Sequence, residues 1–200
     1  MRKNCNIAIL IVSLILCYAC SDIFMMMLGM SEPHPKNIKK LQKYYSSVNS
    51  KESLCYYISY SAMDSLSQLP YKPGWSKGFR PIQFKVFDDK GKLICQYASC
   101  EGSLEKLKIL KSYPPKNADH FPFDTNYTFH REKTMIRSLC KDNAWSHNSD
   151  GITFVVYWGT WLGVPGKKLL KKVYDYASQY SSQSIKIIPV NLAEMDTLHR

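Results

Sequence analysis

Downstream of residue 20, the sequence lacks the motifs of several redox, metal and nucleotide-dependent enzymes. The four cysteines after residue 20 form no Cys-x-x-Cys pair, and there is no glycine-rich phosphate-binding loop. His120, His130, Cys140 and His147 show no familiar metal-ligand spacing. The sequence therefore predicts neither a cofactor nor a metal centre.

Acidic residues are also few. The chain has 16 Asp and Glu against 27 Lys and Arg, which gives a formal net charge of +11. Such a surplus is typical of nucleic-acid-binding proteins, but these lysines are scattered among acids along the sequence. We therefore expect a solvated, lysine-rich face and no nucleic-acid partner. Attraction to an anionic membrane or glycan surface stays open.

The first twenty residues have the pattern of an export signal. Arg2 and Lys3 precede an apolar run that ends at Tyr18, and Cys20 follows the small residue Ala19. This arrangement resembles a bacterial lipoprotein signal, in which the cysteine becomes the lipid-bearing first residue of the mature protein. We interpret residues 1–19 as a lipoprotein signal peptide and Cys20 as the lipidation site.

Two other interpretations of this segment stay open. Residues Ile7 to Met30 would be long enough for an uncleaved membrane anchor, although Asp22 would then place a costly charge inside the bilayer. Ordinary cleaved secretion is the third. All three place the body of the protein outside the cytoplasm. With a lipid on Cys20, we expect it at the outer membrane or the periplasmic face of a Gram-negative bacterium.

The rest of the chain is long enough for one domain. Glu32-Pro-His-Pro35 is typical of an extended segment, so we assign residues 20–35 to a tether. Residues 36–200 are about 165 residues, enough for a domain with its own core.

Several segments upstream of residue 145 show regular patterns. Alternating apolar residues around the turn at Asp88–Gly91 predict a hairpin over Ile82–Tyr97. Apolar residues three or four apart predict helices. Within one of them, Tyr56–Tyr60 also fits a strand, but we favour helix. The expected helices are Lys36–Ser50, Glu52–Leu69, Ser103–Lys111 and Phe129–Lys141.

The last third of the chain predicts a βαβ unit. Ile152–Trp158 is an almost continuous apolar run, as expected for a strand buried on both faces. An amphipathic helix over Lys167–Tyr180 follows, and then a strand over Ile185–Ile188. Pro189 lacks an N–H, so that strand either lies at an edge there or ends. The crossover is expected to be right-handed.

Residues Trp158-Gly-Thr-Trp-Leu-Gly-Val-Pro165 join this strand to this helix. They resemble the active-site turn of thioredoxin-like, membrane-tethered thiol-disulfide oxidoreductases, which reads roughly Trp-Ala-Thr-Trp-Cys-Gly-Pro-Cys. The nucleophilic cysteine falls on Leu162 and the resolving cysteine on Pro165. The resemblance covers Thr153 to Met195. It implies an α/β fold with a thioredoxin-like sheet of about four or more strands, flanking helices and additional N-terminal helices.

A weaker resemblance lies upstream. Arg80-Pro81, the hairpin and the helix after Ser103 are similar to the unit that closes a thioredoxin domain. In the family this unit follows the βαβ unit, whereas here it precedes it. Either the strand order is permuted, or the hairpin is an unrelated addition beside a truncated sheet.

The resemblance implies a turn without its usual chemistry. Leu162 cannot act as a nucleophile, and Pro165 suits the first turn of a helix, where its missing N–H needs no partner. We expect Trp161, Leu162 and Val164 to form an apolar patch for a peptide or protein partner. The full contact set is Trp158, Thr160, Trp161, Leu162, Gly163, Val164 and Pro165.

The sequence thus predicts a non-catalytic envelope protein that binds a partner. Cys55, Cys95, Cys100 and Cys140 remain in the mature chain and permit two disulfides. The main alternative is a thiol-disulfide oxidoreductase in which Cys95 pairs with Cys100 or Cys140, and it requires an exposed thiol with a lowered pKa. A third hypothesis is a structural subunit whose tyrosine-rich N-terminal helices form the interface.

Overall fold

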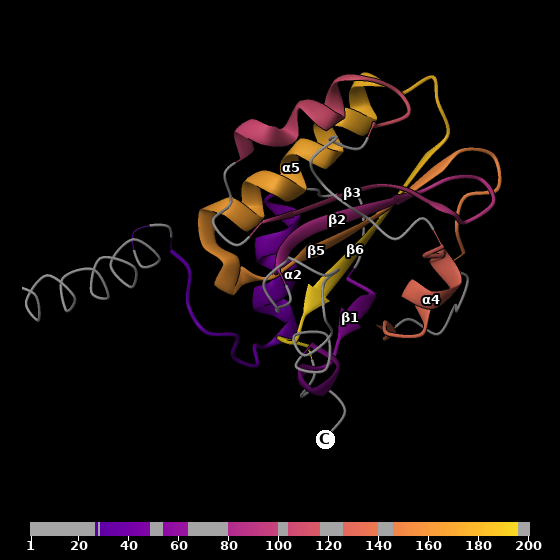
Figure 1. Cartoon of the computed structure of the whole chain (residues 1–200). Helices are drawn as coiled ribbons and strands as arrows, with labels where there is room; N and C mark the ends of the chain where they lie inside the picture. The colour runs from indigo at the N-terminus through magenta and orange to yellow at the C-terminus, as the bar shows by residue number, and fades with distance from the viewer. Residues whose placement is uncertain are drawn as a thin grey trace, which may run out of the picture.

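The computed structural model describes residue 27 and residues 29–48, 54–63, 80–99, 104–116, 126–139 and 146–195. In these ranges a six-stranded mixed sheet has the order β3-β2-β5-β6-β1-β4 (Figure 1). The strands are β1 Tyr56–Ile58, β2 Ile82–Phe87, β3 Leu93–Ser99, β4 Arg137–Ser138, β5 Ile152–Trp158 and β6 Ile185–Leu192. The helices are α2 Ile38–Ser46, η1 Leu104–Lys111, α4 Phe129–Lys133, η2 Thr160–Leu162 and α5 Gly163–Gln179, with η1 and η2 of the 3₁₀ type. The α/β class expected from the sequence is confirmed.

Strand β5 lies in the middle of the sheet. It pairs in parallel with β6 and antiparallel with β2, and all seven of its residues are buried. A continuous apolar run fits this position because neither face of the strand meets water. The predicted central strand and the predicted hairpin of β2 and β3 are both confirmed.

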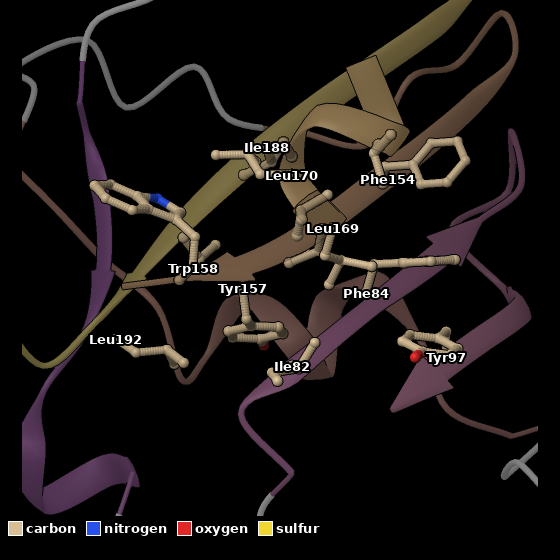
Figure 2. Close-up of a cluster of buried hydrophobic side chains, with 14 of the residues drawn as sticks. Ile82, Phe84, Tyr97, Phe154, Tyr157, Trp158, Leu169, Leu170, Ile188 and Leu192 are labelled. Carbon is tan, nitrogen blue, oxygen red and sulfur yellow. The ribbon is translucent and has the colours of Figure 1, made fainter. Parts of the chain in front are cut away.

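Successive residues of β5 contact different layers, because side chains alternate along a strand. Phe154 and Trp158 share one face of the sheet. The ring of Phe154 lies 5.4 Å from Tyr176 of α5, and the indole of Trp158 stacks on Tyr44 of α2 at 5.9 Å. Figure 2 shows buried hydrophobic side chains of β2, β3, β5, β6 and α5; Phe154 and Trp158 in it lie on this face, whereas Tyr157 lies on the other. Helices α2 and α5 therefore cover the same face.

The opposite face carries α4. Tyr157, next to Trp158 in β5, points the other way and donates its hydroxyl hydrogen to the carboxylate of Glu132 in α4. This face is more polar than the first, since Gln83 and Gln96 are buried on it together with Glu132.

Pro189 lies inside β6, which continues to Leu192. On one side Pro189 pairs with Val156 of β5. On the other side the pairing with β1 begins only at Val190. Of the two predictions for this strand, the edge position is therefore right and the ending is wrong.

Two predicted helices are wrong in whole or in part. The segment Glu52–Leu69 contains strand β1, which adds to β6 in parallel. The segment Phe129–Lys141 is helical only over Phe129–Lys133 and then forms β4, antiparallel to β1. Both changes have one cause: the hydrogen bonds of a sheet edge outweigh weak local helix preference.

The remaining helices differ in detail. The Ser103–Lys111 segment forms a 3₁₀ helix with non-helical angles at Leu107 and Leu110. The last long helix begins at Gly163, earlier than the expected Lys167. None of the helices in the described ranges has the length and apolar content that crossing a bilayer requires.

Candidate functional site

The turn between β5 and α5 is the place where the resemblance puts an active site. Thr160 to Leu162 form one 3₁₀ turn, and α5 begins directly after it. Gly163 has a φ of +54°, a conformation that side chains with a Cβ adopt rarely, so a glycine is favoured here. The hydroxyl of Tyr44 donates to the Gly163 carbonyl at 3.3 Å and ties α2 to this turn.

Leu162, at the position of the nucleophile, is fully buried. A Cβ atom added to Gly166, one turn further along α5, would lie only 2.5 Å from the Leu162 Cβ. The leucine therefore packs directly on the backbone of the helix. Pro165 is buried as well. Both positions are part of the core, so the expected patch cannot include Leu162 and that part of the prediction is wrong.

The other members of the predicted contact set differ in exposure. Trp158 is 1 % exposed, and its buried Nε1 has no hydrogen-bond partner among the residues that the structure describes. Trp161 is partly buried, and its Nε1 donates to the Leu192 carbonyl at 3.2 Å. Val164 is 48 % exposed. The apolar surface offered at this turn thus consists of Val164 and one side of Trp161.

A buried carboxylate closes the turn. Glu194 is 0 % exposed and lies just after β6. Its Oε2 accepts hydrogen bonds from the Thr160 N–H at 2.7 Å and from the Asn191 amide at 3.1 Å. Its Oε1 accepts from the Thr160 hydroxyl and lies 3.5 Å from the Lys36 ammonium. The carboxylate is therefore supplied with donors and a counter-charge, which is how a buried charge is stabilised.

This carboxylate affects a neighbouring phenol. Burial, and secondarily the negative charge of Glu194, raise the pKa of Tyr44 to about 12. Tyr44 therefore stays neutral at physiological pH and acts as a hydrogen-bond donor.

The chain's own N-terminal segment lies across the turn; we call residues 29–36 the strap. Met30 is buried, and the Ser31 N–H donates to the Trp161 carbonyl at 2.8 Å. At the other end, the Lys36 N–H donates to the Glu194 carbonyl at 3.0 Å, and its ammonium donates to Thr160 Oγ1. Residues between these two attachments are mostly exposed. Part of the predicted tether is thus bound to the domain.

Of the three cysteines in the alternative redox site, the structure describes only Cys95. Cys95 is a free, fully buried thiol on β3, and burial raises its pKa to about 12. A reactive cysteine needs the opposite shift. Cys55 is disulfide-bonded, and its partner lies outside the described residues. Cys20, Cys100 and Cys140 also lie outside them.

A second buried carboxylate was not anticipated from the sequence. Glu132 accepts hydrogen bonds from the Lys85 ammonium at 2.6 Å, from the Tyr127 hydroxyl at 2.5 Å and from the Tyr157 hydroxyl. The four residues come from β2, β5, α4 and the segment before α4. The one signal was Lys85, a charged residue inside an apolar hairpin, which requires a partner. Three donors engage the carboxylate, as in a structural polar cluster.

Other sequence candidates can be placed only in part. His130 lies in α4, the His147 ring contacts Phe129, and His120 lies outside the described residues. No group of three or more metal-ligating side chains occurs in the ranges that the structure describes. The residues Gly74-Trp-Ser-Lys-Gly78 match the Gly-x-Ser-x-Gly pattern of a serine nucleophile, but they too lie outside those ranges.

Comparison of this chain with protein-family models, with curated proteins and with solved structures gives no match. Its function therefore has to be inferred from its own residues.

Proposed function

We propose that this protein is an exported, redox-inactive, thioredoxin-like domain that binds a peptide or protein partner at the cell envelope of a Gram-negative bacterium. In this proposal a lipid on Cys20 anchors it. The observation that carries the proposal is the turn after β5. A buried leucine occupies the position to which the resemblance assigns the nucleophile, and the strap is bound to this turn through backbone hydrogen bonds.

The arrangement of the sheet supports a thioredoxin-like fold with a permuted order. The βαβ unit of β5, α5 and β6 and the hairpin of β2 and β3 belong to one sheet, and β2 pairs directly with β5. An unrelated addition would not need to pair with the central strand of the βαβ unit. The permuted order is therefore the better of the two explanations left open by the sequence.

Two environments support the proposed lack of thiol chemistry. Leu162 occupies the nucleophile position and is fully buried. The thiol of Cys95, which the alternative needs, is buried and has a raised pKa. Neither residue can supply a thiolate at neutral pH.

The way the strap is held supports the proposed partner binding. Recognition of an extended peptide depends on main-chain hydrogen bonds, with side-chain contacts giving specificity. The turn uses both: the carbonyls of Trp161 and Glu194 accept backbone N–H groups, and the Glu194 carboxylate takes a lysine. Val164 is exposed beside these contacts. A partner would contact Val164 and Trp161 and would either join the strap or displace it.

The experiment is site-specific photocrosslinking in intact cells. A photoreactive phenylalanine analogue replaces Val164 in one variant and Gln179, an exposed residue at the far end of α5, in the control. We expect one discrete adduct from position 164 and none from position 179. The same purified proteins should reduce insulin disulfides no faster than buffer. Reduction that disappears in Cys95→Ser would support the oxidoreductase alternative instead.

The anchor is tested separately. Palmitate labelling of the protein in cells should disappear in Cys20→Ala. Labelling that persists in this variant would remove the lipid anchor and leave the binding proposal in place.

A further inference from the structure

The lysines that look scattered in the sequence gather on two helices of the structure. Helices α2 and α5 together carry seven exposed lysines and one aspartate, Asp175, a formal charge of +6. Only Lys171 among the seven forms an ion pair in the described part of the chain, with Asp175 at 2.8 Å. We call these residues the lysine surface: Lys39, Lys40, Lys43, Lys167, Lys168, Lys171 and Lys172.

The two helices form one surface because they are joined side by side. The hydroxyls of Tyr45 in α2 and Tyr174 in α5 share a hydrogen bond. The Lys167 ammonium lies 5.9 Å from the ring centroid of Tyr44. The buried residues of each helix face the sheet, and both helices cover the same face of it, so the exposed lysines face away from the sheet on one side of the molecule.

The strap brings the N-terminal chain to this surface. A Cβ atom on Gly29 would lie 3.8 Å from Gly163 Cα, so the chain enters the domain where α5 begins. Lys36, at the other end of the strap, leads directly into α2. At 1.5 Å per residue, the seven lysines all lie within about 15 Å of these helix starts.

The distance to the anchor is short. Met30 is ten positions after Cys20, and a fully extended chain of this length spans at most about 35 Å. An anchored domain therefore cannot move far from the bilayer. A basic surface beside a membrane anchor is attracted to anionic headgroups, by about 1 kcal/mol for each lysine near the surface, or roughly fivefold in partitioning.

We propose that the lysine surface docks the domain onto the anionic phospholipid headgroups of the membrane that holds its anchor. This inference rests on the proposed export and anchoring, and it adds an orientation: the lysine-bearing sides of α2 and α5 face the bilayer. The sheet and α4 lie on the far side.

The test measures binding of the full chain carrying Cys20→Ala to vesicles. Vesicles of phosphatidylethanolamine and phosphatidylglycerol at 3:1 are compared with neutral phosphatidylcholine vesicles, which report any insertion by the apolar N-terminus. We expect a higher partition coefficient on the anionic vesicles, falling with added salt. The triple variant Lys167→Gln, Lys168→Gln and Lys172→Gln should reduce the anionic-to-neutral ratio on the order of 100-fold, and at least tenfold.

A matched control removes three exposed lysines elsewhere: Lys90→Gln, Lys92→Gln and Lys133→Gln. This variant has the same net charge as the first triple variant, but its anionic-to-neutral partition ratio should fall by less than threefold. Equal losses in both variants, or no preference for anionic vesicles in the parent chain, would overturn the proposal. So would loss of heparin binding in the first variant without loss of vesicle binding. Palmitate labelling of Cys20 does not depend on any of these outcomes. An error in the proposed headgroup binding can therefore be distinguished from an error in the proposed lipidation.

Discussion

Replacing Leu162 by alanine tests directly whether the position to which the resemblance assigns the nucleophile is part of the core. The side chain is fully buried and packs against the α5 backbone at Gly166. A helix backbone moves little, so the cavity left by the missing methyl groups should collapse only in part. Leucine-to-alanine changes at such sites cost roughly 2–5 kcal/mol, and we expect about 3 kcal/mol for Leu162→Ala.

The assay is urea unfolding followed by circular dichroism, with Val164→Ala as the matched control. Val164 lies two residues away in the same turn but is 48 % exposed. Its truncation should change the free energy of unfolding by less than about 0.5 kcal/mol. A Leu162→Ala cost no larger than that of Val164→Ala would refute the reasoning, because it would mean that the position faces solvent.

A cysteine at the same two positions gives a second readout. The thiol of Leu162→Cys should react with N-ethylmaleimide only as fast as the protein unfolds, whereas that of Val164→Cys should react within minutes. Peptide mass spectrometry separates these thiols from the native ones. Rapid alkylation at position 162 under native conditions would show that the site is still open to substrates.

The other predictions concern the buried carboxylate and the cysteines. Glu194→Gln should cost about 2–4 kcal/mol in urea unfolding, because its new NH₂ would face other donors. Lys36→Met should cost about 1 kcal/mol or less, since that side chain is 36 % exposed; the reverse order would contradict this account. The raised pKa of Cys95 favours the neutral thiol in the folded state. Stability from this group is therefore full below pH 9 and is lost as the pH rises toward 12. Cys95→Ala should weaken that decline, which unfolding curves at pH 8 and 10.5 would measure. Peptide mapping should join Cys55 to Cys140, because Leu139 donates to the Cys55 carbonyl at 2.8 Å. The last residue of β3, Ser99, lies four strand spacings from β1, or about 19 Å; a peptide that joins Cys55 to Cys100 would show the reasoning to be wrong.

The sequence predicted well those elements whose hydrophobic pattern fits only one kind of secondary structure. The apolar run of Ile152–Trp158 could be stable only inside a sheet, and it forms β5. The amphipathic pattern of α5 and the turn of the β2–β3 hairpin are local signals of the same kind. In contrast, β1 and β4 are only three and two residues long. They form because β1 pairs with β6 on one side and with β4 on the other. No local pattern identifies such partners.

The features of the candidate site also fall into those that local sequence predicts and those that only the tertiary structure sets. Local spacing identified the turn at Trp158–Pro165 as the start of a helix, because the residues that favour a helix start are adjacent in the sequence. Only the fold decided that Leu162 is core and that Glu194 and the strap close the turn. The same holds for the lysines: hydropathy placed each on an exposed helix side, whereas packing α2 beside α5 made them one surface. Contacts between distant segments depend on how elements pack against a shared sheet, and that is a property of the tertiary structure alone.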